Sequence, residues 1–167
     1  MKKIFTLIFV SLMLLCVAGC GGKTDTSDLK KMTTEHGLSI CVTKDAEVDS
    51  EEEDSELFLY SEEPNYALDV MFESYESLVE YGYTEETDID YYMEDISEIY
   101  EQGFEKEKDG HYYSINYREF EDGDIAYYET VRKGEQGFFF ISFYCLKDEL
   151  DANLPIFQKM MKTVEVK

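Results

Sequence analysis

The residues with the clearest spacing for chemistry are the acids that follow residue 44. Asp45, Glu47, Asp49 and Glu51 stand at alternate positions, and Glu56 lies eleven residues after Asp45. Carboxylate oxygens are the ligands that calcium prefers, and a twelve-residue loop with acids at such positions is typical of one class of calcium site. The spacing therefore raises the hypothesis of a cation-binding receptor in which this loop takes up Ca²⁺.

Three features of the same segment favour a different interpretation. Ser50 stands where an EF-hand loop has the glycine of its sharp turn, Glu52 replaces the usual apolar eighth residue, and the flanking runs have strand character. We therefore interpret the segment as a solvated acidic loop and assign no metal site or cofactor, with calcium binding as the alternative hypothesis. Saturable stabilisation by calcium that is lost in Asp45→Asn would support the alternative.

No other constellation of residues predicts catalysis. His36 and His111 have no second histidine at helical spacing, cysteine pair or nucleophile motif beside them, so we expect both at the surface or at a strand edge. Neighbouring acids such as Glu94 and Asp95 are so frequent in this chain that they carry little evidence for hydrolase chemistry. We predict no catalytic residue, and a hydrolase is the third and least favoured function class.

The charge of the chain excludes one class of partner. There are 38 acidic against 15 basic side chains, a formal net charge of −23. Such a chain repels phosphate backbones, and no run of lysine or arginine follows the first three residues. We therefore exclude nucleic acid. The hydrophobic share of 44%, with 14 tyrosines and 11 phenylalanines, is sufficient for one core and predicts a single domain over residues 29–167.

The first twenty residues form a sorting signal. Lys2 and Lys3 precede an apolar run that is shorter than the roughly 20 residues of a spanning helix, and the run leads to Val17-Ala18-Gly19-Cys20. This tetrapeptide resembles the lipobox of bacterial lipoproteins, with Val17 where leucine is usual. The resemblance implies that residues 1–19 are a cleaved signal peptide and that Cys20 carries diacylglycerol.

We therefore predict a lipid-anchored protein on the extracytoplasmic face of a membrane, with residues 20–28 as a flexible tether. Cleavage removes Lys2 and Lys3, so 13 basic side chains remain against 38 acidic ones and the formal charge changes from −23 to −25. Cys41 and Cys145 then remain as unmodified cysteines. Both lie in apolar, strand-like runs, where either a disulfide or two buried thiols is compatible with the sequence.

Hydrophobic periodicity predicts an α+β domain. We expect a hairpin of strands 38–42 and 57–60, a strand 66–72, a helix 89–100, a meander of strands 112–117, 125–131 and 138–145, and a closing helix. Thr87 and Asp90 indicate a capping box for the first helix, and Gly103 its end. For the closing helix we expect Asn153 as the cap and Pro155 in the first turn, with a buried stripe of Ile156, Phe157, Met160 and Met161.

The last strand of the meander is apolar at successive positions rather than at alternate ones. Both faces of an antiparallel sheet of about six strands must therefore be covered, and helices are the available covers. The tyrosine doublets Tyr91-Tyr92 and Tyr127-Tyr128 should each place one ring inward and one outward. Outward tyrosines among acids are suited to binding protein or glycan, although most of the tyrosines are expected to pack in the core.

The order of these elements resembles the PsbP-like α/β sandwich over residues 37–166. The resemblance rests on Gly37-Leu38-Ser39-Ile40, on Leu78-Val79-Glu80-Tyr81-Gly82 and on residues 143–161, and the tryptophan often found early in such domains is absent. The family includes a subunit of the photosynthetic oxygen-evolving complex and many small bacterial lipoproteins. It implies a module that assists partners rather than catalyses, and no functional residue carries over. We therefore expect a non-catalytic accessory module that associates with another envelope protein.

Overall fold

The structure is a computed structural model, and it describes residues 26–50, 55–99, 103–121 and 123–167. The predicted signal peptide, Cys20 and Glu51 lie outside the described residues. None of the described helices is long and apolar enough to cross a membrane. The elements are, in chain order, β1 (Leu29–Thr33), β2 (Leu38–Thr43), β3 (Glu47–Val48), β4 (Leu57–Glu62), β5 (Asn65–Ser74), α1 (Tyr75–Leu78), η1 (Val79–Tyr81), α2 (Ile89–Ile99), β6 (Glu105–Lys106), β7 (Tyr112–Arg118), β8 (Ile125–Lys133), β9 (Gly137–Leu146), η2 (Lys147–Glu149), α3 (Leu150–Met161) and β10 (Glu165–Val166).

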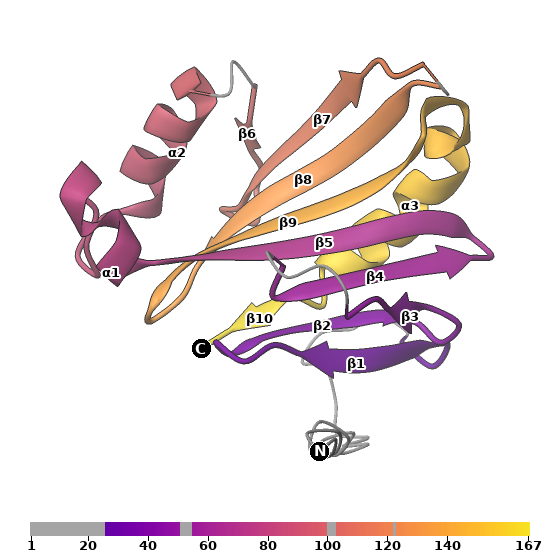
Figure 1. Ribbon diagram of the computed structural model, residues 1–167, viewed down its shortest axis with the longest axis horizontal. Coiled ribbons are helices and arrows are strands. Elements are labelled where there is room, and N and C mark those ends of the chain that lie inside the picture. Colours follow the sequence, from indigo (N-terminus) through magenta and orange to yellow (C-terminus); the bar gives the residue numbers. More distant parts are fainter. Residues whose placement is uncertain (1–25, 51–54, 100–102, 122) are drawn as a thin grey trace, which may run out of the picture.

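The framework of the fold is a seven-stranded antiparallel sheet in the order β3-β4-β5-β9-β8-β7-β6 (Figure 1). β7, β8 and β9 form the predicted meander, and β5 pairs with the free side of β9. β9 is the central strand, and seven of its ten residues are buried, on both faces. Because water cannot solvate either face of this strand favourably, other elements must cover both sides.

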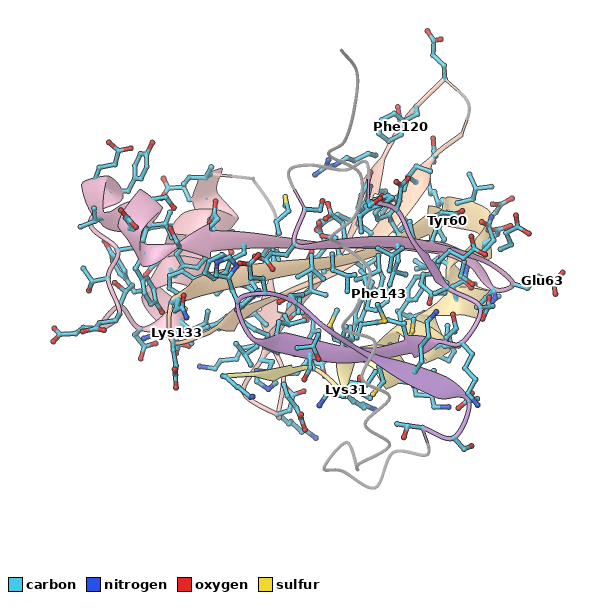
Figure 2. The ribbon with its side chains drawn as sticks, turned by 60° about the horizontal axis from the view of Figure 1, so that its bottom comes forward. Lys31, Tyr60, Glu63, Phe120, Lys133 and Phe143 are labelled. Atoms are coloured by element: carbon cyan, nitrogen blue, oxygen red, sulfur yellow. The ribbon has the colours of Figure 1, made fainter. Side chains whose placement is uncertain are left out.

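One face of the sheet packs against α3 and a second, three-stranded sheet. Phe157 of α3 stacks on Phe143 of β9 with ring centroids 5.0 Å apart, and Tyr66 of β5 meets Phe157 edge-on at 5.6 Å. Figure 1 shows α3 behind β5, and Figure 2 shows Phe143 between the layers. These rings belong to the larger of the two hydrophobic clusters of the described residues, which also includes buried residues of the second sheet such as Leu38 and Ile40.

The opposite face is covered at one end only, by α1, η1 and α2. Tyr92, Met93 and Ile96 form the buried stripe of α2, and Tyr92 lies flat on Phe138 with ring centroids 3.8 Å apart. The second hydrophobic cluster lies here and includes Val131 at the end of β8. Helices therefore lie on both faces of an antiparallel sheet, which confirms the predicted α+β class, with seven strands in the main sheet rather than about six.

The predicted hairpin of residues 38–42 and 57–60 is wrong, because the two strands belong to different sheets. β2 pairs with β1 and β10, whereas β4 pairs with β3 and β5. All six residues of β2 are buried, since it is the middle strand of the second sheet. Its true hairpin partner, β1, was missed because its sequence, LKKMT, lacks a strong apolar alternation.

The start of α2 also differs from the prediction. The carboxylate of Asp88 accepts a hydrogen bond from the amide of Asp90 at 2.8 Å, while the hydroxyl of Thr87 accepts from the amide of Thr84 at 2.8 Å. Asp88 therefore caps the helix and Thr87 closes the preceding turn, in place of the predicted capping box between Thr87 and Asp90. The predicted stop at Gly103 follows residues 100–102, which lie outside the described residues.

The closing helix α3 begins earlier than predicted. It starts at Leu150, so Pro155 lies inside it and Asn153, which was expected as the cap, is buried and donates to the carbonyl of Asn65 at 3.0 Å. Burial of Leu150 in the main core draws the chain into helix before the proline, whose local preference is for the first turn. The buried stripe of Phe157, Met160 and Met161 is confirmed, with Ile156 half-buried.

Side chains tie the second sheet to the first. His36, in the turn after β1, stacks on Phe72 with ring centroids 4.1 Å apart and pairs with the carboxylate of Glu56. Cys41 donates its amide to the hydroxyl of Thr163 at 2.8 Å. Cys41 and Cys145 are both buried, on β2 and β9 respectively, and no disulfide joins them. Of the two arrangements that the sequence left open, the structure has the buried thiols.

The end of the predicted tether contacts the folded part of the chain. Asp28 forms an ion pair with Lys159 of α3 at 2.8 Å, and the carbonyl of Ser27 accepts from Lys44 at 2.8 Å. Both contacts are exposed, so solvent screens them and they add little to stability. They nevertheless define where the chain leaves the domain.

We predict that Phe157→Ala destabilises the protein by about 3–5 kcal/mol, because it removes the ring that links α3 to β5 and β9 and leaves a cavity between the layers. Urea unfolding followed by circular dichroism measures the change. Val79→Ala, at a position that is 60% exposed, is the control and should change stability by no more than about 0.5 kcal/mol. Equal effects of the two substitutions would contradict the assigned core.

Candidate functional site

The structure does not gather the described members of the predicted calcium loop into one site. Asp45 accepts a hydrogen bond from Ser61 at 2.6 Å, and this bond holds the pKa of the Asp45 carboxyl below its usual value. Glu47 accepts from the hydroxyl of Tyr60 at 3.2 Å, whereas Glu56 pairs with His36. Within the described parts of the chain, no three acidic, histidine or cysteine side chains are arranged to hold a metal ion.

A different set of residues is brought together on the face of the large sheet that α2 leaves uncovered. We call this region the open face and define it by two adjacent rows of cross-strand neighbours. The polar row is Ser114, Glu129, Ser142, Asp69 and Phe58, and the aromatic row is Asn116, Tyr127, Tyr144, Ala67 and Tyr60. Because side chains alternate along a strand, both rows lie on the same side as Phe138, which packs against α2.

The aromatic side chains of the open face form a continuous, half-exposed surface. The rings of Tyr127 and Tyr144 have centroids 5.3 Å apart, and those of Phe58 and Tyr144 are 6.4 Å apart. Tyr60 is 42% exposed, and Figure 2 shows it on the side of the sheet away from Phe143. Tyrosines that keep one face in solvent offer stacking area together with a hydroxyl that forms hydrogen bonds.

The chain itself shows that this surface accepts a cation. The guanidinium carbon of Arg118 lies 4.8 Å from the centroid of the Tyr127 ring. Positive groups are attracted to the negative face of an aromatic ring by about 0.5–1 kcal/mol at exposed sites. A guanidinium or ammonium group of another molecule would find the same chemistry on the neighbouring rings.

Glu129 is a buried carboxylate in the middle of this surface. Only 6% of the residue is exposed, and its oxygens accept from Asn116 at 2.7 Å and from Ser142 at 3.1 Å. The amide of Asn116 also donates to the hydroxyl of Ser114, so Ser114, Glu129 and Ser142 of the polar row are connected through hydrogen bonds. Among the described residues, no lysine, arginine or histidine forms an ion pair with Glu129.

Asp69 is the second acid of the polar row and lies on the other side of Ser142. It accepts from the hydroxyl of Ser55 at 2.7 Å, but burial dominates and raises the pKa of its carboxyl. Its strand and that of Glu129 are separated by β9, which places the two backbones about 10 Å apart. The open face therefore combines two acids and a surface of aromatic rings with one basic side chain, Arg118, at its margin. Its carboxylates and rings away from that margin are suited to recognising positively charged groups.

The sequence contained a signal for this site that was not used. Glu129, Ser142 and Asp69 are each a polar residue inside an apolar strand, and the predicted meander already makes the strands of Glu129 and Ser142 neighbours. The expectation for the tyrosine doublets is confirmed: Tyr92 and Tyr128 are buried, while Tyr91 is exposed and Tyr127 is half-exposed. His111 is exposed, whereas the half-buried His36 has a packing role.

Another concave region of the described surface is better explained by structure than by function. An open depression is lined by Glu85, Glu86, Lys133, Gly134, Glu135, Gln136 and Lys167. Lys133 donates to the carbonyls of Glu85 and Thr87, both at 2.7 Å. Its ammonium group thus connects the β8-β9 turn to the segment before α2.

Comparison with known proteins supports the fold more than the function. No family model matches the chain, and no curated protein matches its sequence. Similar solved structures include the cyanobacterial PsbP (CyanoP) of Synechocystis, with 14% identity, coverage of 90% of this chain and 99% of the other, and a TM-score of 0.49. A Bacteroides thetaiotaomicron protein has 14% identity, coverage of 84% and 49%, and a TM-score of 0.54.

The chain thus spans about half of the Bacteroides protein, and the likeness shows a shared fold alone. The comparisons assign no ligand or functional residue to the chain.

We predict that Asp69→Asn stabilises the protein near neutral pH. Burial raises the pKa of Asp69, so the folded state binds this proton more tightly than the unfolded chain. The ionised carboxyl therefore costs stability above its folded pKa, and this cost disappears below the unfolded pKa of about 3.9. Urea unfolding of both proteins between about pH 7 and about pH 3 should show the advantage of Asp69→Asn shrinking as the pH falls.

Asp148→Asn is the matched control, because it makes the same charge change at an exposed position. A stability difference for Asp69→Asn that does not vary with pH would contradict the assignment.

Proposed function

We propose that this protein is a lipid-anchored, extracytoplasmic accessory module that binds a positively charged segment of another envelope protein through its open face. The observation that carries the proposal is Glu129, a buried carboxylate held only by neutral donors and bordered by half-exposed tyrosines. Buried carboxylates are usually paired with a cation, so a partner that supplies the cation completes the site.

The overall charge supports a basic partner. A net charge of −23 attracts positively charged surfaces over a range of about 8 Å at physiological salt and repels acidic ones. The rings of the open face add area for stacking and for contact with the methylene groups of lysine or arginine. Charge thus supports the encounter, whereas the rings and Glu129 support specificity.

The sequence of the first twenty residues supports the location. Anchoring through Cys20 would hold the domain beside the membrane, where the concentration of membrane-bound partners is high. A non-catalytic role is consistent with the open face, since its tyrosines and carboxylates favour recognition of another protein's surface. The proposal therefore combines a predicted anchor with a recognition surface that the fold constructs.

We predict that Cys20→Ala moves the protein from the membrane fraction to the soluble fraction and abolishes its labelling by an alkyne fatty acid in growing cells. The thiol of residue 20 is the attachment point that the lipobox implies. Cys16→Ala makes the same substitution four residues earlier in the signal peptide and should leave labelling unchanged. Labelling that persists in Cys20→Ala would refute the lipid anchor without affecting the open face.

We predict that a photocrosslinking phenylalanine analogue at position 60 captures one envelope protein in native membranes, and that this protein presents a basic segment at the crosslink. The same analogue at position 81, at the end of η1 and also exposed, is the positional control. Glu129→Gln should lower capture at position 60 about tenfold or more, because the partner's cation loses its carboxylate.

Glu135→Gln is the matched control, since it removes the same charge from an exposed site in the β8-β9 turn. It should lower capture less than about twofold, in keeping with the small effect of an exposed charge. Equal capture at positions 60 and 81, or equal effects of the two glutamine variants, would refute binding through the open face.

A further inference from the structure

One margin of the large sheet ends in an incompletely paired strand. β6 pairs with β7 only at Tyr112 and Tyr113, so residues 114–118 of β7 have a neighbouring strand, β8, on one side only among the described residues. Figure 1 shows β7 continuing past β6 at this margin. An unpaired edge presents a row of amide and carbonyl groups that can pair with another chain.

Two of the usual protections against such pairing are absent from the described edge, although Arg118 places one charged side chain at its end. The register of β7 with β8 is continuous from Tyr112 to Arg118, so no bulge bends the edge away, and no proline interrupts it. Ile115 and Tyr117 are 42% and 54% exposed on one face of the edge. Phe120 extends the exposed apolar surface to the projecting end of the β7-β8 hairpin, as Figure 2 shows.

The other face of the same edge belongs to the open face. Asn116 of β7 is the member of the aromatic row at this edge, and its side-chain amide donates a hydrogen bond to Glu129. A strand beside β7 would continue both faces of the sheet, so its alternate side chains would face Ile115 and Tyr117 on one side and the open face on the other.

We propose that an extended, basic segment of the partner adds to residues 114–118 of β7 as an additional strand. This inference rests on the proposed function, because it specifies how the basic partner reaches the open face. The segment carries apolar side chains toward Ile115 and Tyr117 and basic ones toward the open face. Main-chain hydrogen bonds supply affinity and the alternate side chains supply specificity, as in other complexes formed by strand addition.

Charge favours a basic segment over a second copy of this chain. Two copies would bring together two net charges of −23, and the exposed acids Glu119 and Glu121 directly follow each β7 edge. Repulsion between the acids of two paired copies disfavours their association. Lysine or arginine at alternate positions of a partner strand is instead attracted by the negative charge of this chain.

The test uses a ten-residue peptide of alternating lysine and valine, titrated into the protein, with amide hydrogen exchange as the readout. We expect saturable binding that protects those amides among residues 114–118 that point away from β8, which are at alternate positions. A peptide of the same sequence with every backbone nitrogen methylated keeps the charge and the side chains but has no donor for pairing. It should bind at least about tenfold more weakly.

The double variant Ile115→Lys/Tyr117→Lys should weaken binding of the unmodified peptide at least about tenfold, because it places charge on the apolar side of the edge. Val79→Lys/Tyr81→Lys is the matched control: it adds the same charge at exposed apolar positions on η1, far from β7. The control should change affinity less than about twofold.

Several results would overturn strand addition. The first two are equal weakening by the two double variants and equal affinity of the methylated and unmethylated peptides. A third is the absence of protection in β7 at up to about 1 mM peptide. The last is protection of β7 without peptide, accompanied by self-association in sedimentation experiments. Loss of peptide binding in Glu129→Gln together with unchanged binding in Ile115→Lys/Tyr117→Lys would refute strand addition while leaving the proposed function intact. Binding that neither variant changes would refute both.

Discussion

The whole structure depends on the need to cover β9 on both faces. This strand lies at the centre of the large sheet, and phenylalanines point to both of its sides, Phe139 and Phe143 to one and Phe138 to the other. Each exposed aromatic ring would cost a few kcal/mol relative to burial. α3 and the second sheet cover one side, whereas α1 and α2 cover only the first half of the other. The fold is consequently asymmetric, and the open face lies where the covering layer stops.

The transition from core to open face occurs along a single strand. Phe138 of β9 is buried under Tyr92, whereas Ser142 and Tyr144 farther along the same face belong to the polar and aromatic rows. Polar residues replace apolar ones where the sheet is no longer covered by α2, so no large hydrophobic patch is exposed to solvent. Glu129 lies at this boundary, on the face that α2 leaves uncovered, and its neighbours shield it from water. A carboxylate in that setting is stabilised by Asn116 and Ser142 and by any cation that approaches it.

The acidity of the chain and the open face act over different distances. Net charge acts over many ångströms and weakens with salt, so it affects how partners meet. Hydrogen bonds, ring stacking and strand pairing act only at contact and determine which partner stays. The edge of β7 joins the two, because it borders the open face and precedes the exposed acids Glu119 and Glu121. In the proposed complex, main-chain and side-chain groups at one margin of one sheet would therefore recognise the partner together.

The sequence by itself determined the α+β class, the meander and the stripes of α2 and α3, since local periodicity encodes these elements. It also carries the prediction of a lipid on Cys20. Tertiary structure decided what local patterns do not encode: that β2 leaves β4 to pair with β1, and that Leu150 draws α3 past the cap expected at Asn153. It alone placed Glu129, Ser142 and Asp69 in one row, because register across strands depends on contacts between residues far apart in the chain.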